Sequence, residues 1–299
     1  MRELQRQGYS NLVGRTHAEL DLEDVDATRK FFEQERPEIV FLAAAKVGGI
    51  HANNTYPVEF LMSNLLVEAN VCRAAHASNV ARLIFLGSSC IYPRNCPQPI
   101  KEEYLLTGPL EATNRPYALA KIAGIEMCWS YNRQYGTKWL AAMPTNLYGP
   151  GDNYDLDSSH VLPALIRKMH EAKISGASEV VLWGSGTPRR EFLYADDLAN
   201  ALVFLASLDD GRYNALVYPS LCPLINVGTG EDITIRQLAE AVARVVGYTG
   251  KFVQDTSKPD GTMRKVMDVS RIQNLGWKAS TSLQEGIDLT YKKFKEAQA

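Results

Sequence analysis

The stretch RLIFLGSSC, residues 82–90, joins an apolar run to a glycine, two serines and a cysteine. Its first part, residues 82–87, is almost continuous in leucine, isoleucine and phenylalanine, which is typical of a strand covered on both faces. Ligands of open α/β sheets bind beyond the carboxyl ends of the strands. We therefore expect a strand at 82–87 and a binding site that begins at Gly87 and Ser88.

Strand and helix patterns alternate around this stretch. Further strands are expected at residues 11–14, 38–44 and 139–143. Helices are expected between them, at residues 23–35, 58–77 and 117–135, and Pro37 ends the first of these. This alternation predicts a doubly wound parallel sheet with right-handed crossovers, a Rossmann-like α/β fold.

Beyond Pro150 the alternation loosens, which indicates a second, smaller α/β lobe. Its elements are expected at residues 162–171 (helix), 180–183 (strand), 196–205 (helix), 224–227 (strand) and after 282 (helix). Some of these segments are expected to return to the main sheet. We therefore divide the chain into a first domain, 1–150 with parts of 191–230, and a second lobe, 151–190 with 231–299.

Composition excludes several classes of protein. The 299 residues carry 32 Lys and Arg against 34 Asp and Glu, a net charge of −2, so neither nucleic acid nor an anionic membrane is an expected partner. The longest charge-free stretch, 213–230, contains two prolines and cannot form a spanning helix. No secretory signal is visible at the start. Five cysteines without CxxC spacing suit a reducing compartment, the cytoplasm, and no metal site is expected.

The first residues lack a feature that a nucleotide-binding α/β domain normally has. Such domains open with a strand and a glycine-rich turn that holds a pyrophosphate at a helix N-terminus. Residues 1–8 instead resemble the last turns of a helix that ends at Gly8. Either the fold starts differently or the first strand and its glycine-rich loop are missing, and we expect an incomplete gene product.

Tyr117 and Lys121 are four residues apart, on one face of the helix expected at 117–135. A nearby cation stabilises a tyrosinate and lowers the tyrosine pKa, which suits a proton donor to a carbonyl group. Such a pair alone is usually a surface feature. Ser88 at the strand end strengthens the functional interpretation, because it could hydrogen-bond the same substrate oxygen.

These features together resemble a known family. Ser88, the Tyr117–Lys121 pair, the exit PTNLYGP at 144–150 and the motif REFLYADD at 190–197 are similar to the extended short-chain dehydrogenase/reductases that act on nucleotide sugars. The resemblance narrows to the GDP-L-fucose synthase family through residues 42–50, 53–57, 87–93, 183–188 and 258–262. It implies epimerisation of GDP-4-keto-6-deoxy-D-mannose at C3 and C5, followed by NADPH-dependent reduction at C4.

The resemblance also implies roles for individual residues. Tyr117 would protonate the C4 oxygen, Lys121 would hold the cofactor ribose, and Ser88 would orient the oxygen. Epimerisation next to a ketone needs a base and an acid on opposite faces, and Cys90 and His160 suit these roles. Taken singly, Cys90 is more often a small core residue, and His160 is as often a capping or surface residue.

Binding residues are assigned in the same way. Arg15 and His17 follow the first expected strand where a 2′-phosphate would lie, which favours NADP. The other cofactor-binding residues expected are Leu86, Gly87, Ser88, Ser89, Lys121, Pro144, Thr145, Asn146, Leu147 and His160. Lys168, Arg190 and Lys265 are expected to bind the substrate diphosphate, with Trp183 and Asp260 at the base and ribose.

Two alternatives remain open from the sequence. A nucleotide-sugar 4-epimerase or 4,6-dehydratase shares the fold, but dehydratases carry an acid pair where Ser89 and Cys90 stand here. A chain without its glycine-rich loop could also be a non-catalytic nucleotide-sugar-binding protein. Helices 58–77 and 117–135 could form a homodimer seam, although their apolar faces could equally be core.

Overall fold

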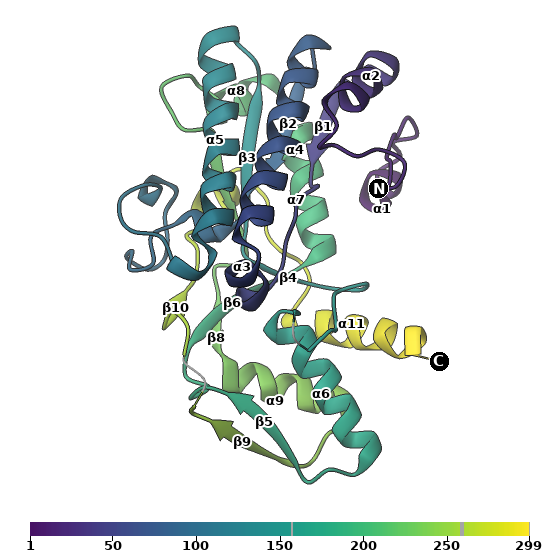
Figure 1. The fold of residues 1–299 in the computed structure, drawn as a ribbon, viewed down its shortest axis with the longest axis vertical. Helices are drawn as coiled ribbons and strands as arrows, with labels where there is room; N and C mark the ends of the chain where they lie inside the picture. Colours follow the sequence, from purple (N-terminus) through teal and green to yellow (C-terminus); the bar gives the residue numbers. More distant parts are fainter. Residues whose placement is uncertain (157, 258–259, 299) are drawn as a thin grey trace.

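The computed structural model describes residues 1–156, 158–257 and 260–298, and a four-stranded parallel sheet in the order β1-β2-β3-β7 forms its larger part. The strands are β1 (Ile39–Leu42), β2 (Arg82–Leu86), β3 (Trp139–Pro144) and β7 (Leu224–Val227). The helices around it are α2 (Val25–Glu35), α4 (Pro57–Ala77), α5 (Arg115–Tyr135), α7 (Ala195–Ser207) and α8 (Asp210–Leu216). Helices α4 and α5 lie side by side on one face, with α7 behind the sheet (Figure 1). The predicted doubly wound fold is confirmed.

The strands of this sheet are apolar because both of their faces are covered. Leu83, Ile84 and every residue from Trp139 to Met143 have no exposed surface. A strand that is covered on both faces favours β-branched and large apolar side chains on both of them. This explains the continuous apolar runs in the sequence.

A second lobe lies below the first in Figure 1 and is built on two smaller sheets. Strands β4 (Asn146–Tyr148), β6 (Arg189–Tyr194) and β10 (Arg264–Lys265) are parallel, and β8 (Asp232–Thr234) pairs with β6 antiparallel. Strand β5 (Glu179–Trp183) pairs in parallel with β9 (Lys251–Asp255). Helices α6 (Val161–Ser175), α9 (Ile235–Val246) and α11 (Leu283–Gln298) cover them. Helix α9 begins at a capping box formed by Thr234 and Gln237 and ends at Gly247, which has φ 74°.

The remaining helical elements of the described residues are short. They are α1 (Arg2–Arg6), α3 (Ile50–Thr55) and α10 (Ser270–Asn274), with single 3-10 turns η1 (Ser89–Ile91), η2 (Glu102–Tyr104) and η3 (Ala112–Asn114). Gly8, expected to end the first helix, has φ 87°. Among the described residues, no helix has the length and apolar content needed to cross a membrane.

Two expectations need correction. The strand expected at 11–14 is absent: these residues are mostly exposed and pair with no strand of the described chain, and an isolated segment without a ladder partner cannot form a strand. The division at residue 231 also differs from the packing. Met267, Val269, Ile272 and Trp277 belong to the larger hydrophobic core, because α10 returns to pack beside β7.

Candidate functional site

The chain leaves the carboxyl end of β2 through Ser88 and enters the turn η1, which contains the buried Cys90. The amide of Gly87 still donates to the carbonyl of Ala142 at 3.0 Å, so the chain leaves the sheet only after this residue. Ser88 then caps η1, and its hydroxyl accepts from the amide of Cys90 at 3.4 Å. A Cβ at Gly87 would lie 2.4 Å from the sulfur of Met143 on β3, so a larger residue here would have to displace the end of that side chain.

Helix α5 presents Tyr117 and Lys121 to the same place. Burial raises the pKa of the Tyr117 phenol, nearby Cys90 and Glu68 raise it further, and a hydrogen bond with Ser88 opposes them. The phenol therefore keeps its proton at neutral pH. The predicted net lowering of this pKa is not found, because burial outweighs the opposing effects. The Lys121 ammonium pairs with Glu68 and lies 5.9 Å from the centroid of the phenol ring.

Glu68 was not anticipated from the sequence. It projects from α4, its side chain is 1% exposed, and its Oε1 lies 3.2 Å from Nζ of Lys121, which is 2% exposed. Burial raises the pKa of Glu68 to about 7 against the opposing effect of Lys121. The available signal was a carboxylate on the buried side of the helix expected at 58–77, four residues after the equally buried Asn64.

The thiol of Cys90 is buried next to these groups. Burial raises its pKa, while Lys265, a hydrogen bond with Ser88, and Lys121 lower it. These interactions bring Ser88, Cys90, Tyr117 and Lys121 together at one place. The neutral thiol is the form that this surrounding favours at neutral pH.

His160 lies at the start of α6, and its backbone carbonyl accepts from the amide of Ala164. Its residue surface is exposed. The adjoining Ser158 accepts a hydrogen bond from the amide of Gly49 at 3.2 Å, which attaches this loop to the segment that follows β1. That segment leaves the carboxyl end of β1. His160 therefore lies at the same edge of the sheet as Ser88.

The residues expected to bind the cofactor fall into two groups. Leu86 to Ser89 and Pro144 to Leu147 leave the ends of the paired strands β2 and β3, so they lie side by side. Arg15 and His17 are apart from them, in the N-terminal segment. Arg15 donates to Glu35 at 2.7 Å and lies over the ring of Phe31, and His17 is exposed beside Asp21 at 3.9 Å.

The residues expected to bind the substrate are in the second lobe. Arg190 on β6 is in register with Lys265 on β10, so two cations lie on neighbouring strands. Burial lowers the pKa of both. Nζ of Lys168 lies 4.8 Å from the centroid of the exposed Trp183 ring. Residues 258 and 259 of the motif at 258–262 lie outside the described residues.

Asp260 performs a structural task in this arrangement. Its carboxylate accepts from the backbone amide of Ser185 at 2.9 Å and from the Ser185 hydroxyl at 2.7 Å. These bonds hold the turn that follows Trp183, and they lower the pKa of Asp260.

Glu191 is a second residue that sequence reasoning missed, although it lies within a quoted motif. The side chain has no exposed surface, and it accepts from the backbone amides of Thr229, Gly230 and Met267 at 2.7–2.9 Å. Its own carbonyl accepts from Asn146 at 2.8 Å. Glu191 therefore connects the exit of β3, the loop after β7 and the segment after β10.

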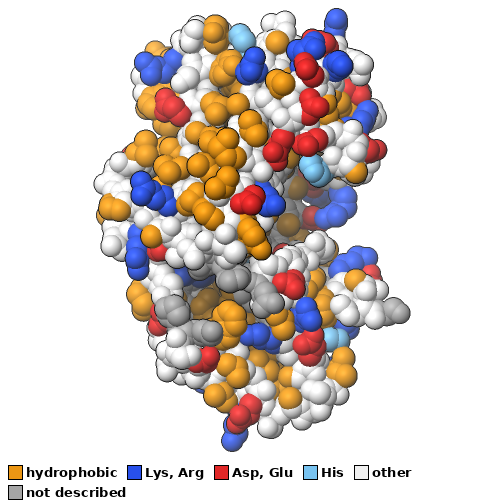
Figure 2. Space-filling model, in the orientation of Figure 1, with side chains coloured by type: hydrophobic (Ala, Val, Ile, Leu, Met, Phe, Trp, Pro, Cys, Tyr) orange, Lys and Arg blue, Asp and Glu red, His pale blue; other side chains and the backbone are white. Residues whose placement is uncertain are grey.

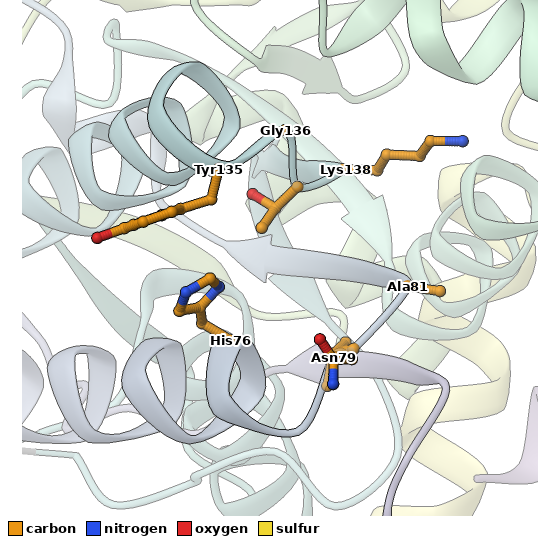
Figure 3. Close-up of a pocket in the computed structure, with 8 residues that line it drawn as sticks. His76, Asn79, Ala81, Tyr135, Gly136 and Lys138 are labelled. Atoms are coloured by element: carbon orange, nitrogen blue, oxygen red, sulfur yellow. The ribbon is translucent and has the colours of Figure 1, made fainter.

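A separate pocket of about 290 Å³ lies away from this chemistry (Figure 3). It is lined by His76 and by residues 79–81 and 135–138, which precede β2 and β3, so it is at the amino end of these strands. His76 and Tyr135 face each other there with ring centroids 4.3 Å apart. The pocket has no part in the site at the carboxyl edge.

Comparisons with known proteins agree with this geometry. A profile of the NAD dependent epimerase/dehydratase family matches residues 1–216. GDP-L-fucose synthase 1 of Arabidopsis thaliana is 55% identical over 97% of this chain and 87% of that protein. GDP-L-fucose synthase of Escherichia coli is 54% identical over 99% of this chain and 92% of that protein. A GDP-D-glycero-L-gluco-heptose synthase from Campylobacter jejuni, solved with NADPH, is 38% identical with a TM-score of 0.90 over 98% and 93%.

Proposed function

Because this chain belongs to the NAD dependent epimerase/dehydratase family and within it to the GDP-L-fucose synthases, we propose that it divides its chemistry between two sets of residues. The overall reaction is the epimerisation of GDP-4-keto-6-deoxy-D-mannose at C3 and C5 and the NADPH-dependent reduction of C4 to give GDP-L-fucose. We assign reduction to Ser88, Tyr117 and Lys121, and epimerisation to Cys90 and His160. The observation that carries this assignment is the packing of α5 against η1 at one sheet edge, where the Ser88 hydroxyl accepts from the amide of Cys90 and the Lys121 ammonium lies 5.9 Å from the centroid of the Tyr117 ring.

The reductive residues are suited to delivering a proton to an oxygen. Tyr117 keeps its proton at neutral pH because burial raises its pKa, and Ser88 is hydrogen-bonded to the same phenol. When the C4 oxygen takes the proton, the tyrosinate left behind needs a nearby positive charge. Lys121, one turn further along α5, supplies that charge.

The residues present fit the nicotinamide half of NADP. The ends of two paired strands, 86–89 and 144–147, offer backbone groups beside a buried ammonium and a phenol. When bound, NADPH supplies the hydride that reaches C4. Lys121 would hold its ribose hydroxyls, and Arg15 and His17 would approach its 2′-phosphate once Arg15 leaves Glu35.

Epimerisation requires a proton to leave one face of the carbon next to the ketone and another to arrive on the opposite face. Cys90 and His160 come from different elements, η1 and the start of α6, which suits attack from opposite sides. The buried Cys90 thiol holds a proton, and histidine side chains exchange protons near neutral pH. The charge that develops on the C4 oxygen would be stabilised by Ser88.

The GDP moiety fits the second lobe. The paired cations Arg190 and Lys265 suit the diphosphate, and Trp183 with Lys168 offers a ring and a cation to the base. Asp260 would contribute by holding the turn after Trp183 as well as by contact with the ribose.

We also propose a homodimer and a cytoplasmic location. Val58, Met62 and Leu66 are exposed at four-residue spacing on α4, and Leu119 is exposed on α5, which packs against α4. Hydrophobic side chains gather over this part of the face in Figure 2. Two copies that pack these helices together would bury the stripe. The five cysteines are all free, which suits a reducing compartment.

Exchange and reduction measured on separate variants test the division of labour. Tyr117→Phe should stop NADPH oxidation while deuterium from D₂O still enters C3 and C5 of GDP-4-keto-6-deoxy-D-mannose. Cys90→Ser should lower the exchange rate by roughly 10²–10⁴-fold, the usual scale of general acid–base catalysis. The controls are Tyr135→Phe, which is exposed, and Cys222→Ser, which is half-buried elsewhere. A Cys90→Ser enzyme with parental exchange, or a Tyr117→Phe enzyme that has lost exchange, would contradict the assignment.

A further inference from the structure

The buried carboxylate of Glu68 forms an ion pair with Lys121, the lysine that we assign to the reduction. Glu68 and Lys121 are both almost unexposed, with 3.2 Å between Glu68 Oε1 and Lys121 Nζ. Neither oxygen of Glu68 accepts an aligned hydrogen bond from any described residue, so the ion pair with Lys121 is its compensation. Removing one partner of such a pair leaves an uncompensated buried charge.

The surroundings of the pair are shaped to hold it. The ring of Phe85 on β2 has its centroid 4.7 Å from Nζ of Lys121. A Cβ at Gly124, three residues after Lys121, would lie 2.8 Å from Glu68 Oε2. Glycine in the middle of a helix costs about 1 kcal/mol relative to alanine, so α5 gives up stability for the space that the carboxylate fills.

The other titratable groups near the pair are few. Electrostatic influence reaches Lys121 from Cys90 and reaches Tyr117 from Glu68. On the side of Glu68, its carboxylate raises the pKa of Cys72 on α4 and of Cys128 on α5. Cys90, Tyr117, Cys72 and Cys128 are all neutral when protonated. Within the described residues, Glu68 is therefore the carboxylate that faces the Lys121 ammonium.

We propose that Glu68 is a positioning residue for the reduction, which keeps the Lys121 ammonium charged and fixes its place beside Tyr117. The inference rests on the role proposed for Lys121. Burial by itself lowers the pKa of Lys121, and Glu68 raises it. Without the carboxylate the lysine loses its proton at a lower pH, and a neutral lysine cannot stabilise the tyrosinate formed when Tyr117 gives up its proton.

The substitution Glu68→Gln removes the charge and keeps the size of the side chain. We expect it to slow NADPH oxidation by about 10–100-fold at pH 8, and to move the alkaline limb of the pH profile for reduction to lower pH. Solvent exchange at C3 and C5 should stay within about twofold of the parent rate, since Cys90 and His160 remain. Glu68→Asp keeps a charge and should restore part of the reduction. The matched control is Glu126→Gln, an exposed carboxylate on α5.

A second measurement needs neither substrate nor cofactor. In free protein labelled with [¹³C]lysine, the signal that disappears in Lys121→Met reports the protonation of this ammonium. Its titration midpoint should move to lower pH in Glu68→Gln, move less in Glu68→Asp, and stay in place in Glu126→Gln. If Glu68→Gln fails to fold, the Glu68→Asp titration decides the matter.

The outcomes separate this inference from the proposed function. If Glu68 acts through Lys121, the double variant Glu68→Gln/Lys121→Met reduces substrate no more slowly than Lys121→Met alone. Additive losses, or an unmoved lysine midpoint, would overturn the positioning role while leaving the function of Lys121 intact. A Lys121→Met enzyme that reduces at the parental rate would instead refute the role of Lys121 and the inference that depends on it.

Discussion

Replacing Gly124 by alanine tests how tightly α5 is fitted against the sheet and the Glu68 carboxylate. The new Cβ would lie 2.4 Å from Cζ of Phe85 and 2.8 Å from Oε2 of Glu68, both far closer than carbon contacts allow. Phe85 is 1% exposed in the central strand β2, and Glu68 is paired, so neither neighbour is a free side-chain end that can swing away. Either the helix or the ring has to move.

The net effect follows from two opposing terms. Overpacking a well-filled core costs about 1–3 kcal/mol, and the buried ring and the paired carboxylate put this site at the upper end. Alanine regains about 1 kcal/mol of helix propensity. We therefore expect Gly124→Ala to lose about 2 kcal/mol of unfolding free energy. That loss corresponds to a fall in Tm of roughly 3 °C for a chain of this size.

Thermal and urea unfolding of the two proteins measure this difference. The matched control is Gly211→Ala in α8, an exposed helical position where the nearest neighbour of a Cβ is Asp209 Oδ1 at 3.2 Å. There, alanine should leave stability unchanged or raise it by up to about 1 kcal/mol. A Gly124→Ala protein as stable as its parent would refute the claim that the core between α5 and β2 has no room for a methyl group.

Two further predictions concern charge and assembly. Burial raises the pKa of the Asp232 carboxyl, but hydrogen bonds from Arg189 and Arg264 outweigh it and leave that pKa below its usual value. A lowered pKa in the folded state adds stability above the unfolded pKa near 3.9 that is lost as the pH falls. Asp232→Asn should therefore destabilise the protein at pH 7, and the loss should disappear only as the pH falls from about 3.9 through the lowered folded-state pKa, as measured by urea unfolding over that range; an equal loss at every pH would contradict the ion-pair explanation. Met62→Asp, in the exposed stripe of α4, should halve the mass measured by light scattering if two copies pair there, whereas the exposed Ser130→Asp on α5 should leave it unchanged; an unchanged mass for Met62→Asp would exclude this seam.

Much of the main sheet could be predicted because its information is local. The apolar runs at 82–87, 139–143 and 224–227 became β2, β3 and β7 with boundaries within one residue, since each strand is buried on both faces. The run at 11–14 has similar composition but pairs with no described strand. Strand formation depends on a partner that a local pattern cannot reveal, which is why the same signal succeeded at β1, β2, β3 and β7 and failed at 11–14.

The candidate site also depends on contacts between distant segments that a local sequence pattern cannot reveal. Ser88, Cys90, Tyr117 and Lys121 could be brought together from motif positions alone, because strand ends and helix faces have predictable directions. Glu68 could not be assigned to Lys121, since nothing in the sequence says that α4 and α5 pack with these two residues facing each other. The direction of the Tyr117 pKa was missed for the same reason: it depends on burial and on a carboxylate contributed by another helix.

The hydrogen bonds of Glu191 show which positions of this protein can change their side chains and which cannot. Its carboxylate recognises backbone amides of Thr229, Gly230 and Met267, and backbone amides are the same for every residue except proline. The anchoring of the second lobe is thus largely indifferent to the side chains around it. The residues along β5, β6 and β10 that we propose to contact a nucleotide sugar could then be exchanged, during evolution or by design, while these three hydrogen bonds of Glu191 stay in place. A scaffold of this kind can change its substrate while keeping its chemistry, provided that one buried acid stays in place.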